Sequence, residues 1–335
     1  MISVLIPALN EGPHIATTVS SFLSQENVSE SVEIIVLDGG SSDDTVGRAR
    51  TALGKHGTVI PNPGRTVSSA ARIGVEMSSG DKIVIAGAHA EYPPSFLAVL
   101  SRALEDPTVG AAGGVLESLP GRKDSGVGIA IADTLGSRLG VGFSHRQVRN
   151  AKEKDVDTVA FPMYRRELFA QLGNYEPKFV RAQDLDFHLR LTNAGWRIVQ
   201  VPDVIVGYRV RSTYPDEARM AFQYGYWKPL INRYHRRLSS VRQLFPPAIV
   251  LFVLFVFVGV LMGAVSPMVL LAPSAYLTLL LIGSVNLARR TGRWRLLLLY
   301  LFSYLVLHSG YGIGYLSGLV RAMINPIRKD PVSTT

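Results

Sequence analysis

The C-terminal third of this 335-residue chain most constrains its fold, because residues 218–329 contain no Asp or Glu and include three long uncharged stretches. These stretches are residues 248–265, 268–288 and 296–320. A helix rises 1.5 Å per residue, so the first stretch alone would be about 27 Å long, close to the thickness of a bilayer's hydrocarbon core. A helix buried in a soluble protein rarely stays apolar on every face over this length. The pattern therefore predicts a helical membrane anchor.

The basic residues around these stretches predict their orientation. Residues 228–242 precede the first stretch and residues 289–295 separate the second from the third, and both flanks are rich in Lys and Arg. The positive-inside rule puts both in the cytoplasm, as two spans joined by a short Ser-Pro-Met turn require. A complete third crossing would put Arg321, Arg328 and Lys329 outside, against this rule, whereas a re-entrant or interfacial third helix would not. The sequence leaves these alternatives open.

The acidic residues divide the chain. Residues 1–217 hold 25 acidic against 22 basic residues, a net charge of −3, while the remainder holds 1 acidic against 13 basic, a net charge of +12. We expect a cytoplasmic domain at 1–217, a basic and aromatic juxtamembrane segment at 218–245, an anchor of two to three helices at 246–322 and a short tail at 323–335. Because the excess of basic charge is confined to the membrane part, no nucleic-acid partner is expected.

The start of the chain and its cysteine content bear on its compartment. The opening MISVLIPALNEG lacks a basic segment and its apolar run breaks at Pro7, so no signal peptide is predicted. The absence of cysteine excludes disulfides, which fits a cytoplasmic domain. We expect an integral protein of the plasma or inner membrane, with its N-terminal domain in the cytoplasm.

Strand and helix patterns alternate along the first 115 residues. The runs SVLIPA, VEIIVLD, TVIPN and DKIVIAG have strand character, and each of the first three is followed by a segment with helical spacing. This rhythm predicts an α/β domain with a mostly parallel sheet flanked by helices. Another strand is expected in GAAGGVLES, and a mobile loop region over residues 121–155. No dinucleotide or Walker fingerprint is present, so a nucleotide site is expected instead where polar residues follow the strands.

Several motifs carry a family resemblance. SVLIPALNE, EIIVLDGGSSDDT, the segment from NPGR to GAHAEYPP, and RAQDLDFHLRL follow one another as in the inverting family 2 glycosyltransferases with the GT-A fold. The later segments DTVAFPMYRRELF, YRVRST and QYGYWK most resemble the membrane-bound glucosyltransferases of succinoglycan-type exopolysaccharide synthesis. The resemblance covers roughly residues 1–230. It implies a GT-A type, Rossmann-like sheet followed by a C-terminal transmembrane anchor.

The resemblance implies a nucleotide site at the ends of the first strands. An Asp after the second strand suits a base or ribose, because its carboxylate accepts hydrogen bonds from N–H and hydroxyl groups. Two arginines would meet the pyrophosphate. The residues so assigned are Pro7, Asn10, Glu11, Asp38, Arg65 and Arg72. Alternatively, Asp38 only organises the Gly39–Gly40 turn and the arginines are solvated charges. Asp43 and Asp44 are expected to be first-turn acids of a helix.

A divalent cation, Mn²⁺ or Mg²⁺, is the cofactor that the resemblance implies. Members of the family end their fourth strand in Asp-x-Asp or Asp-x-His, whereas this chain has Gly87, Ala88 and His89. His89 is the expected metal ligand, with Glu91 as a second ligand if the chain stays extended. The alternative is that His89 caps a strand and the metal site has been lost.

Asp184 in RAQDLDF matches the family's general base, which deprotonates the acceptor hydroxyl. One base opposite the leaving diphosphate suffices for a single inverting displacement. Gln183 replaces the usual glutamate and keeps a hydrogen-bonding side chain of the same shape. Asp186 and Arg190 are expected to pair along the following helix. The alternative reading of Asp184 is a helix-start acid.

Further residues are assigned more loosely. The resemblance places His145, Arg146, Tyr164 and Arg165 near the donor or acceptor sugar. Trp227 in QYGYWK could stack on a sugar, although aromatic residues beside a membrane more often form an interfacial belt.

Glycines recur every four residues near the end of the third stretch, at Gly310, Gly314 and Gly318. Such a bare helix face predicts close packing against another helix, and with it a possible homo-oligomer.

The predicted function is an inverting transferase that moves a hexose, glucose from UDP-glucose first among them, to a lipid-linked saccharide in cell-surface polysaccharide synthesis. The expected partners are the nucleotide sugar, the lipid-linked acceptor and membrane lipids. Two alternatives remain open at this point. One is a polyprenyl-phosphate glycosyltransferase, and the other is a non-catalytic sugar-nucleotide-binding scaffold for membrane glycosyltransferases.

Overall fold

The computed structural model describes residues 1–122, 125–140, 153–263, 269, 271–325 and 327. The chain separates into two compact units. The sheet unit comprises Met1–Glu117 and His145–Arg209, and the helical unit comprises Ser118–Ser144 and Val210–Thr335.

The first four strands of the sheet unit are parallel, as predicted. They are β1 (Ile2–Ala8), β2 (Val32–Asp38), β3 (Gly57–Pro61) and β4 (Lys82–Ile85), in the spatial order β3-β2-β1-β4. Their carboxyl ends therefore lie at one edge of the sheet, and the loops that follow them meet there.

Beyond β4 the sheet becomes antiparallel, which the sequence did not predict. The remaining strands are β5 (Ala90–Glu91), β6 (Val109–Pro120), β7 (Lys154–Asp155), β8 (Ala160–Arg165) and β9 (Arg197–Val210). The order continues from β4 through β8, β6 and β9 to β5, with β7 also paired to β9. Strand β8 is antiparallel to both β4 and β6. The sheet is therefore mixed, with the parallel part confined to β1–β4.

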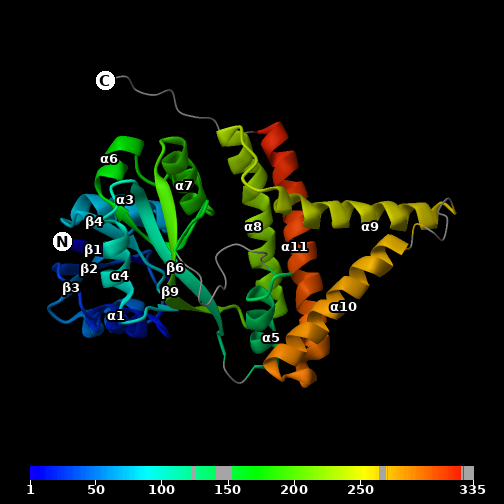
Figure 1. The fold of residues 1–335 in the computed structure, drawn as a ribbon, viewed down its shortest axis with the longest axis horizontal. Helices are drawn as coiled ribbons and strands as arrows, with labels where there is room; N and C mark the ends of the chain where they lie inside the picture. The colour runs from blue at the N-terminus through cyan, green and yellow to red at the C-terminus, as the bar shows by residue number, and fades with distance from the viewer. Residues whose placement is uncertain (123–124, 141–152, 264–268, 270, 326, 328–335) are drawn as a thin grey trace. The chain divides into compact units, whose positions relative to one another are not determined.

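Helices cover both faces of the sheet (Figure 1). One face packs against α1 (Ile15–Leu23), α2 (Thr45–Leu53) and α4 (Phe96–Ala103). The other packs against α3 (Val67–Met77), α6 (Glu167–Leu172) and α7 (Gln183–Asn193). Side chains alternate along a strand, so in β1 Val4 and Ile6 join the first core while Leu5 joins the second. Burial on both faces explains why these strands read as continuous apolar runs.

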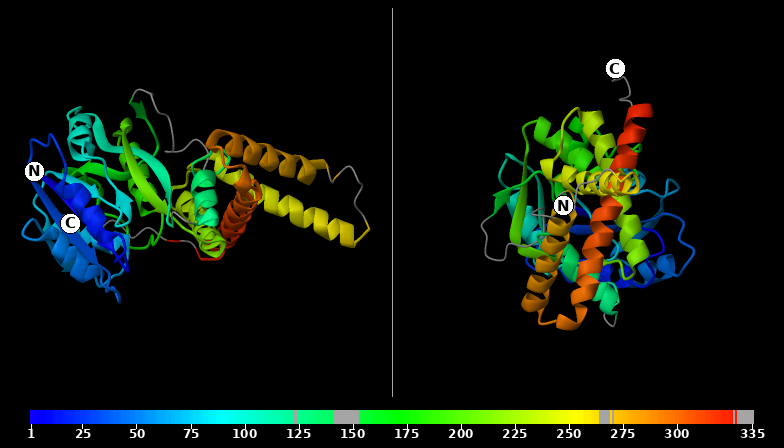
Figure 2. Two further views of the ribbon diagram at one scale, coloured as in Figure 1. Left: turned by 90° about the horizontal axis from the view of Figure 1, so that it is seen from below. Right: turned by 90° about the vertical axis from the view of Figure 1, so that its right-hand side faces the viewer.

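The helical unit contains four long helices and one short one among its described residues (Figures 1 and 2). They are α5 (Gly126–Leu135), α8 (Tyr214–His235), α9 (Phe245–Leu261), α10 (Leu271–Thr291) and α11 (Leu297–Ile324), with short 3₁₀ turns at Val241–Leu244 and Trp294–Leu296. The loop predicted at 121–155 is thus wrong for residues 126–135. Helix α5 packs on α11 through Ala130, which lies in a buried cluster with Tyr300.

Among the residues that the structure describes, three helical segments are long and apolar enough to cross a membrane. They are Val241–Leu261, Leu271–Thr291 and Trp294–Ile324. Length and composition thus confirm the predicted run of two to three apolar helices.

The glycine face of α11 packs against α8 of the same chain. A Cβ added at Gly314 or Gly318 would overlap the carbonyl oxygen of Phe222 or Tyr226, and one at Gly310 would lie 3.1 Å from Ala218 O. The prediction of close helix packing is confirmed. Because α8 of the same chain occupies this face, the structure does not offer the face to a second copy of the chain, and a homo-oligomer stays a prediction without it.

Candidate active site

Asp38 closes β2 and folds the turn that follows. Its carboxylate accepts hydrogen bonds from the N–H of Gly40 (3.0 Å), the N–H of Ser41 (3.1 Å) and the hydroxyl of Ser41 (2.5 Å). This is the turn-organising role considered above. A carboxylate has about four lone-pair positions, so this role does not exclude a ligand at the same group.

The loop after β1 is tied to the loop after β2. Asn10 adopts a left-handed conformation (φ 56°), and its side-chain oxygen accepts a hydrogen bond from the N–H of Ser42 (2.8 Å). Asp43 accepts a hydrogen bond from the N–H of Gly12 (3.0 Å) and others from Thr45. Asp43 is therefore structural, but it and Asp44 precede α2 instead of lying in its first turn as predicted. The pKa of Asp43 lies below the ordinary value, chiefly because the Thr45 hydroxyl donates to it.

The loop after β3 brings Arg65 to the same edge. Its backbone is left-handed (φ 56°), and its Cα lies 3.5 Å from the position of a Cβ added at Gly39, directly after Asp38. The Arg65 side chain is exposed, as is that of Arg72 one turn into α3. The exposed guanidinium of Arg65 at this edge suits an anionic ligand, whereas Arg72 lies further along α3.

His89 lies just beyond β4 and faces the loop after β1. Its Nδ1 atom is 2.9 Å from a carboxylate oxygen of Glu11, and its ring lies 4.9 Å from that of Tyr208. Glu91, two residues on, instead forms an ion pair with Arg209, whose backbone N–H also donates to the carbonyl of His89 (3.3 Å). Of the two residues predicted as metal ligands, His89 is thus paired with Glu11 and Glu91 is paired with Arg209.

Sequence reasoning assigned no role to two residues of this cluster. Arg209 was noticed only within the YRVRST segment, and His14 not at all. His14 is the N-cap of α1. Its pKa is lowered by partial burial, and Glu11, His89, Arg209 and Glu91 all act on it electrostatically. Helical spacing marks the start of α1, but only the fold brings that start next to β5 and β9.

The chain has no room for the carboxylate that is missing at position 87. A Cβ added at Gly87 would lie 2.6 Å from the nearest ring atom of Phe161 on β8. The space is thus filled by an aromatic ring. The glycine is therefore part of the local packing.

These residues fit a divalent cation that is shared with a ligand. Within the described part of the chain, no group of three or more His, Cys, Asp or Glu side chains could hold a metal ion. However, a metal-binding histidine commonly has its other ring nitrogen held by a carboxylate, as Glu11 holds Nδ1 of His89. Glu91 suits this role less well than predicted, because Arg209 would compete with the cation for its carboxylate.

Asp184 lies in the first turn of α7, after Ala182, which is in a left-handed conformation (φ 58°). One oxygen of Asp184 accepts a hydrogen bond from the N–H of Leu185 (2.8 Å). Behind Asp184 lies the buried hydroxyl of Tyr175, whose pKa is raised by burial and then by the negative charge of Asp184. The predicted Asp186–Arg190 pair is confirmed at 2.6 Å.

A buried hydrogen bond fixes the segment that leads to Asp184. Ser68, in the first turn of α3, donates to the carbonyl of Phe179 (3.0 Å). Since α3 starts directly after Arg65, this segment lies against the edge that carries the strand-end loops. Next to Asp184, the side-chain oxygen of Gln183 is buried and accepts no hydrogen bond from any described residue. Such an atom suits a hydroxyl donor from a ligand.

Two residues predicted to touch sugars do not lie in the site. Tyr164 is fully buried in the core, where its hydroxyl bonds to Tyr175 (3.0 Å) and His188 (2.8 Å). Arg165 pairs in register with Lys82, at the opposite end of β4 from His89. Its guanidinium donates to backbone carbonyls after α4 and in β6. Both predictions are wrong, because the antiparallel run of β8 carries these side chains away from the strand-end loops.

The other predicted residues are placed as follows. Pro7 lies in β1 beside Leu37 of β2, one residue before the strand ends. Trp227 lies on α8 of the helical unit, with its ring 5.8 Å from that of Tyr226. His145 and Arg146 lie outside the described residues.

Comparisons with known proteins agree with this geometry. Residues 3–173 match glycosyl transferase family 2, which is slightly more than half of the chain. This span includes Asp38 and His89 and ends before Asp184.

Two characterised relatives match along most of their length. A Methanococcus voltae protein named dolichyl N-acetyl-alpha-D-glucosaminyl phosphate 3-beta-D-2,3-diacetamido-2,3-dideoxy-beta-D-glucuronosyltransferase is 24% identical over 331 residues, 96% of this chain and 97% of that protein. Succinoglycan biosynthesis protein ExoA of Rhizobium meliloti (strain 1021) is 27% identical over 250 residues, 73% of this chain and 74% of that protein.

A solved structure shows the same fold. The mannosyltransferase PcManGT from Pyrobaculum calidifontis, in complex with GDP-Man and Mn²⁺, aligns with a TM-score of 0.58 at 21% identity and covers 92% of this chain and 86% of that one. The family match, the relatives and the shared fold agree: the chain is a glycosyltransferase with a GT-A fold and belongs to glycosyl transferase family 2.

Proposed function

We propose that this chain is an inverting hexosyltransferase that transfers a hexose, glucose from UDP-glucose first among them, to a lipid-linked saccharide acceptor at the membrane. One observation carries the proposal. Asp38 and the Glu11–His89 pair lie at the ends of adjacent parallel strands, and the segment before Asp184 is bonded to the start of α3 at the same edge. The residues assigned here to the nucleotide, and the segment that leads to the residue assigned as base, thus meet at one edge of the sheet.

The relatives support the class of acceptor. The printed name of the Methanococcus voltae protein describes transfer to a dolichyl-phosphate-linked sugar, and that of the Rhizobium meliloti protein describes succinoglycan synthesis. A chain with three helices apolar enough to cross a membrane suits an acceptor held in a bilayer. We place the sheet unit in the cytoplasm, where nucleotide sugars are made, consistent with the basic flanks of the apolar helices.

Asp184 would act as the general base. Its carboxylate accepts the proton of the acceptor hydroxyl while that oxygen attacks the anomeric carbon, and the nucleoside diphosphate leaves from the opposite face. A single displacement inverts the configuration, so an α-linked donor gives a β-linked product. Gln183 would hold a sugar hydroxyl through its unpaired oxygen.

Two kinds of side chain would hold the donor: a carboxylate at the nucleoside and guanidinium groups at the diphosphate. Asp38 accepts hydrogen bonds from the nucleoside, while Pro7, Asn10 and Glu11 shape the loop beside it. Arg65 and Arg72 would pair with the diphosphate, which guanidinium groups recognise through paired N–H donors.

His89 would hold a divalent cation, Mn²⁺ or Mg²⁺, together with the diphosphate. Such cations are usually bound through one or two protein ligands plus substrate phosphates. When bound, the cation neutralises charge on the leaving diphosphate. The protein's own contribution is to fix the imidazole through Glu11 and to keep Arg209 on Glu91.

The test is turnover by the purified full chain in lipid vesicles. UDP-, GDP- and dTDP-hexoses are offered, each with a lipid-linked saccharide or with polyprenyl phosphate, with and without Mn²⁺. Transfer from a UDP-hexose to the saccharide, with inverted configuration, is expected. Transfer to polyprenyl phosphate alone would assign the chain to polyprenyl-phosphate glycosyltransferases. Donor binding without transfer to any acceptor would indicate a scaffold.

A further inference from the structure

Helices α8 and α11 run side by side in the same direction over most of α11 (Figures 1 and 2). At one end the hydroxyl of Tyr214 donates to the carbonyl of Leu299 (3.1 Å), and at the other end Gly318 packs on the backbone of Tyr226. The 12 residue steps from Tyr214 to Tyr226 rise about 18 Å along α8, more than half the thickness of a hydrocarbon core. The environment that surrounds this part of α11 therefore surrounds α8 as well.

Helix α8 is too polar to lie inside a bilayer. It carries Asp216, Arg219, Lys228 and Arg233 within 22 residues, and it is not among the three apolar segments of the described chain. Asp216 and Arg219 form an ion pair whose side chains are 43% and 69% exposed. Charged groups on a lipid-facing helix are strongly unfavourable at the bilayer centre. If α11 crossed the membrane, α8 would have to enter it too.

A second segment of the helical unit bonds to the middle of α11. This segment, residues 125–140, follows β6 in the chain and contains α5. Within it, Ser137 bonds to the hydroxyl of Tyr304 (2.7 Å), and the carbonyl of Leu139 accepts from Nε2 of His308 (2.8 Å). Tyr304 and His308 lie about two and three turns into α11. Two polar side chains in the middle of α11 are thus bonded to a segment that lies outside the three apolar helical segments of the described chain.

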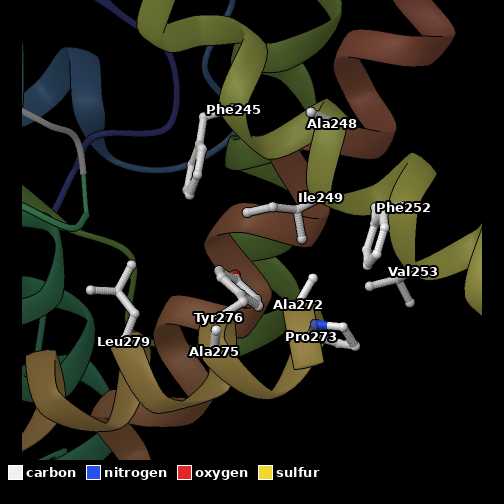
Figure 3. Close-up of a pocket in the computed structure, with 10 residues that line it drawn as sticks. All are labelled: Phe245, Ala248, Ile249, Phe252, Val253, Ala272, Pro273, Ala275, Tyr276 and Leu279. Carbon is white, nitrogen blue, oxygen red and sulfur yellow. The ribbon is translucent and has the colours of Figure 1, made fainter. Parts of the chain in front are cut away.

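Helices α9 and α10 behave differently. Figures 1 and 2 show α9 running crosswise to α8 and α11, which it meets where Gly312 packs against Pro246 and Val250. Of the 18 most apolar consecutive residues in the segment that contains α9, only 11% are buried, compared with 33% in the segment that contains α11. Between α9 and α10 lies an apolar cavity of about 480 Å³, into which Ile249, Phe252 and Tyr276 point (Figure 3). Such a pair suits a hydrocarbon environment on every side.

We infer that only α9 and α10 cross the bilayer and that α11, with α8 beside it, lies along the membrane surface from which α9 starts. The lipid-facing stripe of α11 has helical spacing and is exposed by 49–80%. Its members are Leu298, Phe302, Ile313, Val320 and Ile324. Lipid is the occupant because the stripe consists of exposed apolar side chains and residues 218–329 include basic but no acidic residues, which suits an anionic headgroup.

This arrangement resolves the orientation left open by the sequence. With two crossings, Arg321 stays on the same side as the basic residues that flank α9 and α10. The positive-inside rule is then satisfied throughout the described part of the chain.

The absence of cysteine makes a direct test possible. Single cysteines are introduced in the full chain at the exposed positions Ser240, Met262, Arg295 and Asn325. Each variant is labelled with a membrane-impermeant maleimide in inside-out and in right-side-out vesicles. Ser240→Cys, Arg295→Cys and Asn325→Cys are expected to react from one side and Met262→Cys from the other. Reaction of Asn325→Cys from the same side as Met262→Cys would mean that α11 crosses, and would overturn the inference.

A depth measurement gives a second, independent readout. Spin labels at Leu298→Cys, Ile313→Cys and Ile324→Cys are expected to lie at similar, shallow depths. A label at Phe255→Cys, in the middle of α9, is expected to be deeper than all three. A label at Ile313 that is deeper than those at both ends of α11 would contradict a surface helix. Neither readout depends on the reaction that the sheet unit catalyses.

Discussion

The carboxylate of Glu11 lies 2.9 Å from Nδ1 of His89, and this pair joins the loop after β1 to the tip after β4. The two residues are 78 positions apart in the chain, and β1 pairs directly with β4. A carboxylate at one nitrogen fixes the imidazole ring and raises its basicity at the other. In the proposed function this pair would leave Nε2 of His89 for the cation, whereas Glu91 is held by Arg209.

Separate replacement of His89 and of Glu11 tests whether His89 binds the cation and Glu11 holds the imidazole ring. His89→Ala is expected to abolish stimulation of turnover by Mn²⁺. Glu11→Gln is expected to weaken apparent Mn²⁺ affinity by about 10- to 100-fold, the usual effect of losing a partner of a metal ligand. Titration of turnover with Mn²⁺ measures both effects, with Glu91→Gln as the matched control. A larger loss of affinity in Glu91→Gln than in Glu11→Gln would show that Glu91 is a ligand after all.

Gly87→Asp is expected to destabilise the sheet unit. The ring of Phe161 fills the space, so the new side chain must displace it, at a cost of about 1–3 kcal/mol. Thermal unfolding in detergent measures the loss. The double variant Gly87→Asp/Phe161→Ala should recover part of what Gly87→Asp loses relative to its own Phe161→Ala parent. A Gly87→Asp variant as stable as the natural chain would mean that the ring moves freely.

Gly314→Leu is expected to separate α8 from α11. A side chain there collides with the backbone of Phe222, which cannot move without shifting the whole of α8. The expected destabilisation of about 1–3 kcal/mol would appear as a lower unfolding midpoint of the full chain. Ile313→Leu, on the exposed stripe, is the control and should leave the midpoint unchanged. Equal midpoints for the two variants would argue against tight packing of α8 on α11.

His188 predicts a dependence of stability on pH. It is fully buried between the hydroxyls of Thr158 (2.6 Å) and Tyr164 (2.8 Å), and burial lowers its pKa from 6.5 to about 3. Below pH 6.5 the unfolded chain therefore takes up a proton that the folded chain does not. Stability is full above pH 6.5 and falls as the pH drops towards 3, by at most about 1.4 kcal/mol per pH unit from this group.

Unfolding curves between pH 4 and pH 8 test that dependence. His188→Gln should flatten the fall below pH 6.5, while His56→Gln, at an exposed position, should leave it in place. An unchanged slope in His188→Gln would mean that other groups cause the acid sensitivity.

Local pattern was enough to predict the parallel half of the fold. The alternation of apolar runs and helical spacing defined β1 to β4 and α1 to α3, and strand ends with polar residues located Asp38 and His89. The same reasoning predicted the Asp186–Arg190 pair, because residues four apart share a helix face.

What failed depends on contacts between distant segments. Tyr164 and Arg165 belong to a strand whose antiparallel direction is set by its neighbours β4 and β6, so no local pattern shows which end faces the site. The sequence also could not show that α8 packs on the glycine face of α11, because α9 and α10 lie between these two helices in the chain. The links of Glu11 to His89 and of Arg209 to Glu91 likewise depend on strand order.

Replacement of the base tests the central claim most directly. Asp184→Asn keeps the size and hydrogen-bonding capacity of the side chain but removes its basicity. With a lipid-linked saccharide as acceptor and saturating donor, we expect a loss of about 10²- to 10⁴-fold in turnover, the usual worth of a general base, with nucleotide-sugar binding retained. Asp203→Asn, an exposed carboxylate on β9, should keep full activity. Turnover of Asp184→Asn within a few-fold of the natural chain would contradict the assignment of Asp184 as the base of this glycosyltransferase.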